Sequence, residues 1–327
     1  MTGLSDSFQR PINYLRISVT DRCNLQCIYC MPTCGVQLMS HHDILTYEEI
    51  YTIVLAATEL GIKKVRLTGG EPLARLGLPR LIQMLADIDT IDDISLTTNG
   101  SLLGHYAAEL KQAGLHRVNV SLDTLKPDKF EFITHSNRLS DVLEGIEVAR
   151  SVGLNPIKIN ITVMFGINDD ELLDFAHTTI DDGWHVRFIE VMPVAGGGTT
   201  IPQTISASDI RKRLNSLGEL KPCLPSIGNG PAKYFRFPQA KGTIGFITPI
   251  SGHFCFSCNR LRLTADGKLR LCLLADDEID LKQSLRSGIS LAELKRLIEA
   301  AVASKPLQHH LTEGYVPKIR PFSQVGG

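Results

Sequence analysis

The sequence has almost no net charge, because 34 lysines and arginines stand against 35 aspartates and glutamates. No global field therefore attracts nucleic acid or an anionic membrane, although basic residues can still cluster locally. No segment offers eighteen uninterrupted apolar residues, and residues 1–11 lack the apolar core and cleavage site of a secretion signal. We therefore expect a cytoplasmic protein with no nucleic-acid partner and no membrane association.

Repeats and low-complexity segments are also missing, apart from an alternation of strand-like and helix-like segments. Eight cysteines would suggest disulfides in a secreted chain, but no secretion signal precedes them. Six of the eight fall into two triplets with the spacing of metal ligands, so reduced thiols that hold metal are the better interpretation. We assign no role to the remaining two, Cys34 and Cys223.

The first triplet is Cys23, Cys27 and Cys30, in a C-x3-C-x2-C run directly after the apolar residues 14–20. Three thiolates can bind three irons of a cubane 4Fe-4S cluster and leave the fourth iron open for a substrate or cofactor. A zinc knot, or buried thiols without metal, is the alternative. A second strand followed by a Gly-Gly-Glu-Pro loop at 69–72 adds a neighbouring loop site and favours the cluster.

The second triplet is Cys255, Cys258 and Cys272, of which the third lies across a hairpin that the pair at 266–267, Asp-Gly, predicts. Structural zinc with His253 as a fourth ligand is an equally good interpretation of these residues alone.

Two arginines, Arg260 and Arg262, follow the C-x2-C and share one face of a predicted strand. Alternating arginines are more often a solvated strand face, but a neighbouring metal site makes an anion-binding surface reasonable.

Strand and helix patterns alternate along the first two thirds of the chain. Apolar, β-branched runs predict strands at 15–19, 64–68, 93–97, 117–122, 157–164 and 185–191. Helix-period segments lie at 46–60, 78–87, 103–113, 140–152 and 169–180, and Thr46 with Glu49 has the spacing of a capping box. Such units imply a parallel sheet, which can be open and doubly wound or curled into part of a TIM-like barrel.

The pattern changes after Met192. A glycine-rich turn at 193–198 is followed by a helical stretch at 206–217. Beyond it, short strands are predicted at 234–237, 243–249, 259–264 and 268–271, with a helix at 291–303. These short elements indicate a small α+β unit.

The cysteine and glycine motifs together resemble those of the radical S-adenosylmethionine (SAM) superfamily. Longer matches resemble one family within it, the GTP 3′,8-cyclases that begin molybdenum cofactor biosynthesis (the molybdenum cofactor biosynthesis protein A family). The matching segments are 15–24, 66–72, 96–100, 119–123, 166–170, 187–190, 258–263 and the final Gly326 and Gly327. The resemblance covers nearly the whole chain.

This resemblance implies a fold and a domain organisation. The fold class is α/β, a partial (βα)6 TIM-like barrel with chemistry at the carboxyl ends of its strands and a smaller C-terminal α+β cap. The barrel with the SAM cluster would span 12–192, a connecting loop and helix 193–217, and the cap with the second cluster and the Gly-Gly tail 218–327. The stretch 193–203 looks shorter and more glycine-rich than is typical of the family, which leaves its contacts open.

The cofactors that the resemblance implies are two 4Fe-4S clusters and SAM. Cys23, Cys27 and Cys30 would hold the cluster that binds and cleaves SAM, and Cys255, Cys258 and Cys272 the cluster that binds the purine of GTP. The SAM contacts carry over to Tyr29, Gly70, Ser121 and Met192.

The GTP contacts carry over to Arg16, Lys64, Arg66, Thr97, Lys158, Arg187, Arg260 and Arg262. Guanidinium groups suit this role because they bind phosphate oxygens in a bidentate manner. In the family the double-glycine tail reaches into the active site, so the expected catalytic set is Arg260, Arg262, Gly326 and Gly327.

The activity implied by the resemblance is cyclisation of GTP to (8S)-3′,8-cyclo-7,8-dihydroguanosine 5′-triphosphate. SAM would be cleaved to methionine and a 5′-deoxyadenosyl radical, which takes the ribose C3′ hydrogen and leaves as 5′-deoxyadenosine, and the C3′ radical would attack guanine C8. The implied partners are GTP, an external one-electron reductant, a second copy of the chain in a homodimer, and a downstream cyclic pyranopterin monophosphate synthase that receives the product.

Two rival hypotheses remain. A radical SAM enzyme that modifies peptides would share the first triplet and the barrel, but such enzymes usually carry more C-terminal cysteines than this chain. A metal-binding regulator with one iron and one zinc site would leave the substrate-binding matches without a purpose.

Overall fold

The computed structural model describes residues 3–31, 35–193, 203–224 and 227–326. Three parts of the chain discussed above lie outside these ranges: Cys34, Gly327 and most of the stretch 193–203.

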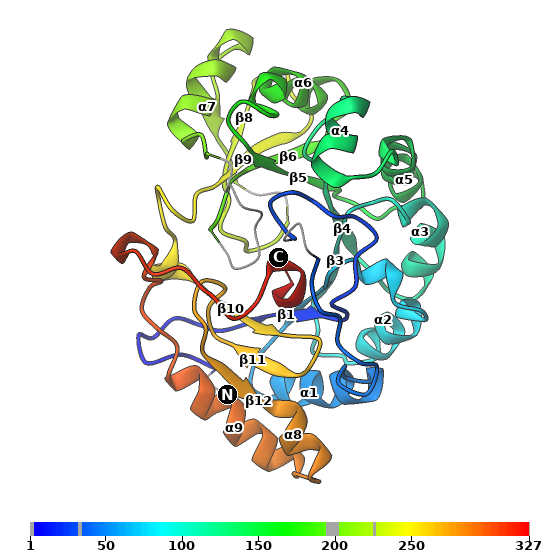
Figure 1. Ribbon diagram of the computed structural model, residues 1–327, viewed down its shortest axis with the longest axis vertical. Coiled ribbons are helices and arrows are strands. Elements are labelled where there is room, and N and C mark those ends of the chain that lie inside the picture. The colour runs from blue at the N-terminus through cyan, green and yellow to red at the C-terminus, as the bar shows by residue number, and fades with distance from the viewer. Residues whose placement is uncertain (1–2, 32–34, 194–202, 225–226, 327) are drawn as a thin grey trace.

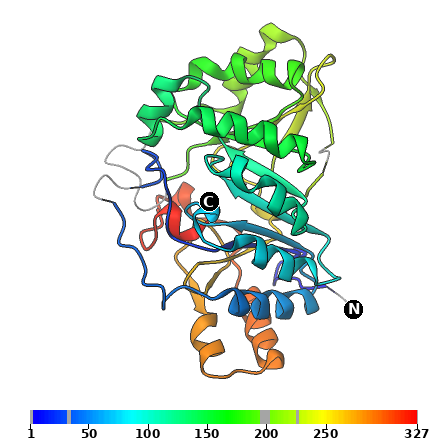
Figure 2. The same cartoon turned by 90° about the vertical axis from the view of Figure 1, so that its right-hand side faces the viewer.

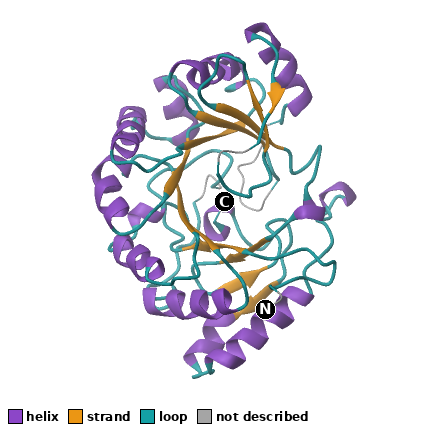
Figure 3. Ribbon diagram, turned by 180° about the vertical axis from the view of Figure 1, so that it is seen from behind, coloured by secondary structure: helices purple, strands orange, loops and turns teal. Residues whose placement is uncertain are grey.

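Six parallel strands form the centre of the fold. They are β1 (Tyr14–Ser18), β2 (Lys64–Thr68), β3 (Asp93–Thr98), β4 (Arg117–Ser121), β5 (Lys158–Val163) and β6 (His185–Glu190). Each strand pairs in parallel with the next one along the chain. The sheet curls, and Figures 1 and 3 show its strands on the inside of an arc with helices outside.

The outer helices bury one apolar face each against this sheet. They are α1 (Tyr47–Glu59), α2 (Leu78–Ala86), α3 (Leu103–Gln112), α4 (Pro127–Thr134), α5 (Leu139–Ser151) and α6 (Leu172–Asp181), with short 3-10 turns η1 (Pro72–Ala74) and η2 (Asp169–Glu171). The predicted capping box is present at the start of α1, where Thr46 and Glu49 bond each other's backbone amides. Only α4 was not predicted; proline occupies its first turn and Phe130 and Ile133 are buried.

C-terminal strands extend both ends of this sheet. On one side β10 (Arg260–Leu263) pairs in parallel with β1, followed by β11 (Lys268–Arg270) and β12 (Glu278–Asp280). On the other side β9 (Thr243–Ile247) pairs in parallel with β6, followed by β8 (Lys233–Arg236) and β7 (Lys221–Pro222). The described strands thus form one twelve-stranded sheet that runs from β12 to β7 without closing.

The partial barrel predicted from the sequence is therefore confirmed, and the Asp-Gly hairpin connects β10 to β11 with Gly267 at a φ of 78°. The C-terminal part has the expected α+β composition, but its strands join the barrel sheet itself. The boundaries at 192 and 217 stay predictions.

The remaining helices lie around this extended sheet. They are α7 (Ala207–Leu214), α8 (Leu281–Arg286), α9 (Leu291–Ala303) and α10 (Phe322–Val325), with 3-10 turns η3 (Asn215–Leu217), η4 (Cys255–Ser257) and η5 (Leu311–Glu313). Figure 2 shows α8 and α9, in orange, projecting at one end, and Figure 1 shows α10 within the arc of strands. In the described part of the chain, no helix combines the length and apolar character needed to cross a membrane.

Candidate active site

A cavity of about 320 Å³ lies inside the curl of the sheet. Its walls come from β1 to β6, β9 and β10 and from the loops that follow them. Both cysteine triplets, all four predicted SAM contacts and most of the predicted GTP contacts line it. Residues from near both ends of the chain, such as Tyr14 and Ser323, therefore share one chamber.

The first triplet occupies the loop after β1. All three side chains are half-buried free thiols. Burial raises the pKa of Cys23 to about 11 and that of Cys30 to about 12, and it raises the pKa of Cys27 as well. A thiol binds metal as the thiolate, and buried thiolates need a neighbouring cation. Three such thiols beside one cavity fit an iron cluster, which would supply that positive charge.

The second triplet lies on η4, two residues before β10 and in the loop after β11. Two buried cations hold its backbone: Arg10 donates to the Cys255 carbonyl over 2.7 Å, and Lys305 Nζ donates to the Arg260 carbonyl over 3.0 Å and to that of Leu271. Although burial opposes the thiolate, Lys305 and Arg260 lower the pKa of Cys258. This donor set also fits an anionic thiolate cluster.

The alternative of single zinc ions finds no matching group among the residues that the structure describes. Within them, no three His, Cys, Asp or Glu side chains are placed to hold one metal ion. A cubane spreads its thiolates over separate irons, whereas zinc gathers all its ligands at about 2.0–2.3 Å from one atom. His253 is exposed, faces the cavity and stacks edge-on against His309 with ring centroids 5.8 Å apart.

The predicted SAM contacts lie around the first triplet. Tyr29 donates a 2.7 Å hydrogen bond to Asp123, whose pKa burial raises to about 6. Ser121 ends β4 and Met192 follows β6. Only glycine fits at position 70, because a Cβ on Gly70 would lie 2.3 Å from the Arg22 carbonyl oxygen.

Glu71, next to this glycine, holds the loop in place. Its buried carboxylate accepts hydrogen bonds from the Thr98 hydroxyl and the Asn99 amide, both 2.7 Å long, and from the Leu73 amide at 3.0 Å. Burial nevertheless raises its pKa to about 7. Glu71 and Asp123 lie in segments that resemble the cyclase family. Their hydrogen bonds to neighbouring strands could not be predicted from the sequence.

Arginines form much of the cavity wall on β1, β2, β6 and β10. Arg16, Arg66, Arg187, Arg260 and Arg262 line the cavity together with Thr97. The register places Arg262, Arg16 and Arg66 side by side on adjacent strands. Burial and the neighbouring arginines lower the pKa of Arg16, and lower those of Arg187 and Arg262 to about 10.

Several polar atoms in this wall have no hydrogen-bond partner among the described residues. They are the buried Nε atoms of Arg16, Arg187 and Arg260 and the Oδ1 of Asn160. Buried polar groups in native structures normally have partners, and like charges this close repel one another. The arginine atoms in this wall are therefore suited to an anionic ligand, whereas the Asn160 oxygen needs a hydrogen-bond donor.

Two of the predicted GTP contacts do not line the cavity. Lys64 is half-buried at the start of β2, and Lys158, at the start of β5, bonds the Ile227 carbonyl. Burial and nearby arginines lower the pKa of Lys158 to about 6. Both lysines occupy the amino ends of their strands, one layer below the residues that form the wall.

Sequence reasoning missed the polar residues that support this layer. Arg117 forms a buried ion pair with Asp93 on the adjacent strand β3, and Arg187 of β6 donates to Asn119 of β4 across the intervening strand β5. Alternation along β4 puts Arg117, Asn119 and Ser121 on one face. That alternation was the signal that could have found the first two.

Gly326 lies against the arginines of the cavity wall. The Arg262 guanidinium donates a 2.8 Å hydrogen bond to the Gly326 carbonyl, and Gly326 is buried with a φ of 66°. A Cβ at this position would lie 2.6 Å from Thr68 Cγ2. The expected approach of the tail to the arginines is therefore seen for Gly326, while Gly327 lies outside the described residues.

Comparisons with known proteins agree with this geometry. Residues 17–179 match the Radical SAM superfamily, and residues 184–311 match Molybdenum Cofactor Synthesis C. A SAM-bound structure of SuiB from Streptococcus suis superimposes with a TM-score of 0.65, covering 90% of this chain and 68% of that one. At 13% identity this likeness concerns the fold alone. Fold and site thus define a radical SAM protein.

Full-length relatives specify the family. A GTP 3′,8-cyclase of Moorella thermoacetica is 49% identical over 324 residues, covering 99% of this chain and 100% of that protein. A GTP 3′,8-cyclase of Pelotomaculum thermopropionicum is 50% identical over 326 residues with the same coverage. The chain belongs to the GTP 3′,8-cyclase family.

Proposed function

We propose that this chain converts GTP to (8S)-3′,8-cyclo-7,8-dihydroguanosine 5′-triphosphate by radical SAM chemistry, as the first step of molybdenum cofactor biosynthesis. The observation that carries the proposal is one cavity lined by both cysteine triplets and by five arginines, three of which have buried Nε atoms without a hydrogen-bond partner among the described residues. The full-length similarity to proteins named GTP 3′,8-cyclase supports the same conclusion.

The two triplets would hold two 4Fe-4S clusters. Once bound, the clusters would supply an electron for SAM cleavage and open coordination positions for SAM and for the purine. The protein's own part is positional: Gly70 lets the loop backbone approach closely, and the Tyr29–Asp123 hydrogen bond fixes the ring beside the first triplet. Ser121 and Met192 would complete the SAM contacts.

The arginine wall would bind the triphosphate. Arg16, Arg66 and Arg187 carry the largest share in this proposal because they line the cavity from three strands. An anion between them would relieve their mutual repulsion and supply partners for the unpaired Nε atoms of Arg16 and Arg187. Thr97 would add a hydroxyl, and Lys64 and Lys158 would act from the layer below.

Arg260 and Arg262 would act at the end of the cavity nearest the second triplet. Arg262 also holds the Gly326 carbonyl, so the tail and the arginine would approach the guanine together. Bringing reacting groups together in a chamber that excludes water is the main rate contribution that the protein can make.

The partners beyond GTP are proposals as well. The reaction needs an external one-electron reductant, and its product would pass to a cyclic pyranopterin monophosphate synthase. A homodimer and cytoplasmic localisation also stay predictions.

The test is anaerobic reconstitution with iron and sulfide, followed by SAM, reductant and GTP. We expect about eight irons per chain, as two cubanes require, together with 5′-deoxyadenosine and the cyclised nucleotide. Cys27→Ser should abolish both products, whereas Cys223→Ser is the matched control, because Cys223 is also half-buried but does not line the cavity.

Two results would contradict the proposal. Deoxyadenosine without the cyclised nucleotide would keep the radical chemistry and reject GTP as substrate. About four irons together with zinc would reject the two-cluster arrangement.

A further inference from the structure

The last residues of the chain, 315–326, form a segment that we call the tail. It begins with exposed residues such as Tyr315 and Ile319 and ends with Val325 and Gly326 buried in the molecule. Figure 1 shows its helix, α10, inside the arc of strands. The tail therefore passes from the surface into the cavity within a few residues.

The inner end of the tail has few polar contacts of its own. Helix α10 has four residues, which is far too short to be stable in isolation. Its Gln324 side chain reaches the Gln37 carbonyl only at 3.5 Å, and the buried hydroxyl of Ser323 has no partner among the described residues. The bond from Arg262 to Gly326 is thus one of few fixed points at this end.

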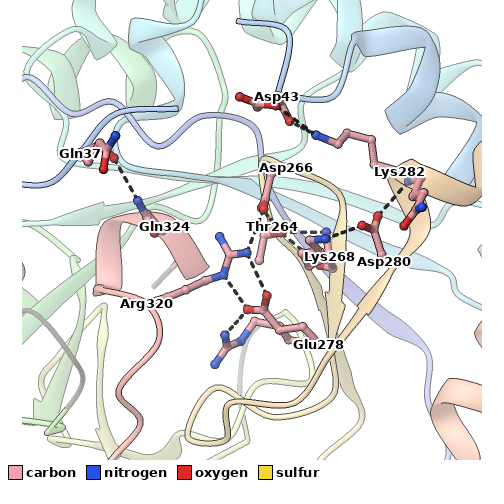
Figure 4. A network of polar contacts seen from close by, with 12 residues as sticks. Gln37, Asp43, Thr264, Asp266, Lys268, Glu278, Asp280, Lys282, Arg320 and Gln324 are labelled. Carbon is pink, nitrogen blue, oxygen red and sulfur yellow. Dashed lines mark hydrogen bonds and ion pairs between the residues drawn. The ribbon is translucent and has the colours of Figure 1, made fainter. Parts of the chain in front are cut away.

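Arg320 provides a much stronger attachment just before α10. Its guanidinium binds Glu278 through both carboxylate oxygens, with Nε to Oε1 at 2.6 Å and Nη2 to Oε2 at 2.9 Å. Nη2 also donates to Asp266 Oδ2 at 2.8 Å. Figure 4 shows Arg320 pointing from the tail into the space between these two carboxylates.

These ion pairs are shielded from solvent. Arg320 is only 8% exposed, and the Asp266 and Glu278 side chains are 13% and 14% exposed. Burial opposes all charges here, yet the pairing lowers the pKa of Asp266 and raises that of Arg320. Shielded bidentate pairs of this kind are geometrically specific, unlike ion pairs at an open surface.

The two carboxylates belong to the same edge of the sheet as Arg262. Asp266 lies in the turn between β10 and β11, and Glu278 begins β12. Asp276 adds a second attachment, since it accepts hydrogen bonds from the Lys318 amide at 3.0 Å and the Tyr315 hydroxyl at 2.6 Å. The tail is therefore attached to the antiparallel strands β10 to β12 and their connections before α10, and to Arg262 of β10 after it.

We propose that Arg320 is a positioning residue whose pairs with Asp266 and Glu278 hold the tail in the cavity and keep the Gly326 carbonyl on Arg262. An unattached tail would have to lose its conformational freedom in every turnover, whereas an attached one keeps its end at a high local concentration near the arginines. The effect on turnover rests on the proposed function, while the effect on tail position does not.

The test compares four variants of the full chain with the unchanged protein. Arg320→Ala removes the attachment, Arg320→Lys keeps the charge without the planar fork, and Asp266→Asn removes one of the two partners. Arg286→Ala is the matched control, because Arg286 makes the same two-oxygen contact with Glu49 on helices away from the tail.

Two quantities are measured after reconstitution. Hydrogen exchange of a peptide covering the tail reports its attachment, and the ratio of cyclised GTP to 5′-deoxyadenosine reports its effect on the reaction. We expect tail exchange in Arg320→Ala to be at least about tenfold faster, with a similar loss in the product ratio and unchanged iron content. Arg320→Lys and Asp266→Asn should fall between, and Arg286→Ala should match the unchanged protein.

Equal tail exchange in Arg320→Ala and Arg286→Ala would overturn the proposal. Faster exchange with an unchanged product ratio would overturn the link between tail position and reaction. Should Arg320→Ala fail to fold, Arg320→Lys and Asp266→Asn decide the same questions. Should the unchanged protein fail to cyclise GTP, the proposed function falls, but the exchange comparison still decides whether Arg320 holds the tail.

Discussion

Several cationic side chains near the cavity are removed from solvent and lie beside other cations. Arg16, Arg187 and Lys158 are buried among other cations, and each has a lowered pKa. Such an arrangement costs stability unless an anion joins it. In a binding site this loss of stability is offset when the ligand supplies the missing negative charge. The Arg117–Asp93 pair differs, because Asp93 already supplies that charge and no ligand is needed.

Lys158 gives a prediction on pH. With its pKa lowered from 10.5 to about 6 in the folded chain, the amine is neutral at pH 8. The unfolded chain keeps this proton up to about pH 10.5, whereas the folded chain loses it near pH 6. The burial of Lys158 therefore lowers the free energy of unfolding by its full amount below about pH 6, and this loss shrinks as the pH rises from 6 to 10.5.

A triphosphate near Lys158 would raise that pKa again. We expect binding of GTP at pH 8 to take up close to one proton, measured by calorimetry in buffers of different ionisation enthalpy. Lys158→Met should remove most of this uptake, and Lys212→Met, at an exposed pair with Asp209, should leave it unchanged. Equal uptake in both variants would show that another group binds the proton.

Elements are positioned by close backbone approaches at the carboxyl ends of the strands. The loop after β2 touches the loop after β1, where Gly70 donates to the Thr20 carbonyl over 2.8 Å and Glu71 to that of Arg22 over 2.7 Å. Glu71 then reaches the end of β3. Three successive strand ends are thereby held together beneath the first triplet.

This contact predicts the effect of Gly70→Ala. The added Cβ would meet backbone atoms of Arg22, which cannot yield without moving the loop. We expect a loss of about 1–3 kcal/mol in the free energy of unfolding and at least tenfold weaker SAM binding, measured by denaturant titration and calorimetry. Gly104→Ala in α3 is the control, since its Cβ would meet its nearest neighbour at 3.7 Å. If Gly70→Ala behaves like this control, the loop is not tightly held.

The whole molecule is one curled sheet whose two ends come from the C-terminal third of the chain. β10 brings Arg260, Arg262 and the second triplet beside β1, and β9 continues the wall beyond β6. Because the arginines of the cavity wall stand on strands of this one sheet, repulsion between them lowers the stability of the sheet as a whole.

A ligand for these charges should stabilise the fold even without iron. We expect inorganic tripolyphosphate at about one hundred times its dissociation constant to add about 2.7 kcal/mol to the metal-free chain, measured as a rise in Tm. Arg16→Gln should reduce this rise, whereas Arg80→Gln, at an exposed pair with Glu48, should not. An equal rise in both variants would place the anion elsewhere.

Local patterns were enough to predict much of this protein. Periodicity and turn chemistry over a few residues predicted the strands at 64–68 and 93–97, the second of which extends to residue 98, together with the capping box at Thr46 and the hairpin at Gly267. The cysteine triplets and the arginines of the wall were identified from motifs and their resemblance, and the fold brings them to one cavity. Each of these signals is carried by neighbours in the chain.

What the sequence by itself determined was therefore most of the elements, the metal-binding motifs and the family, whereas α4, α8, α10, β7 and β12 were not predicted. Only the tertiary structure decided that β9 and β10 extend the barrel, that Lys64 and Lys158 lie below the cavity, and that the tail is attached through Arg320. Arg320 meets carboxylates 54 and 42 positions away. Such pairs leave no periodic trace, because burial and charge balance act on neighbours in space, and those neighbours exist only after the sheet has formed.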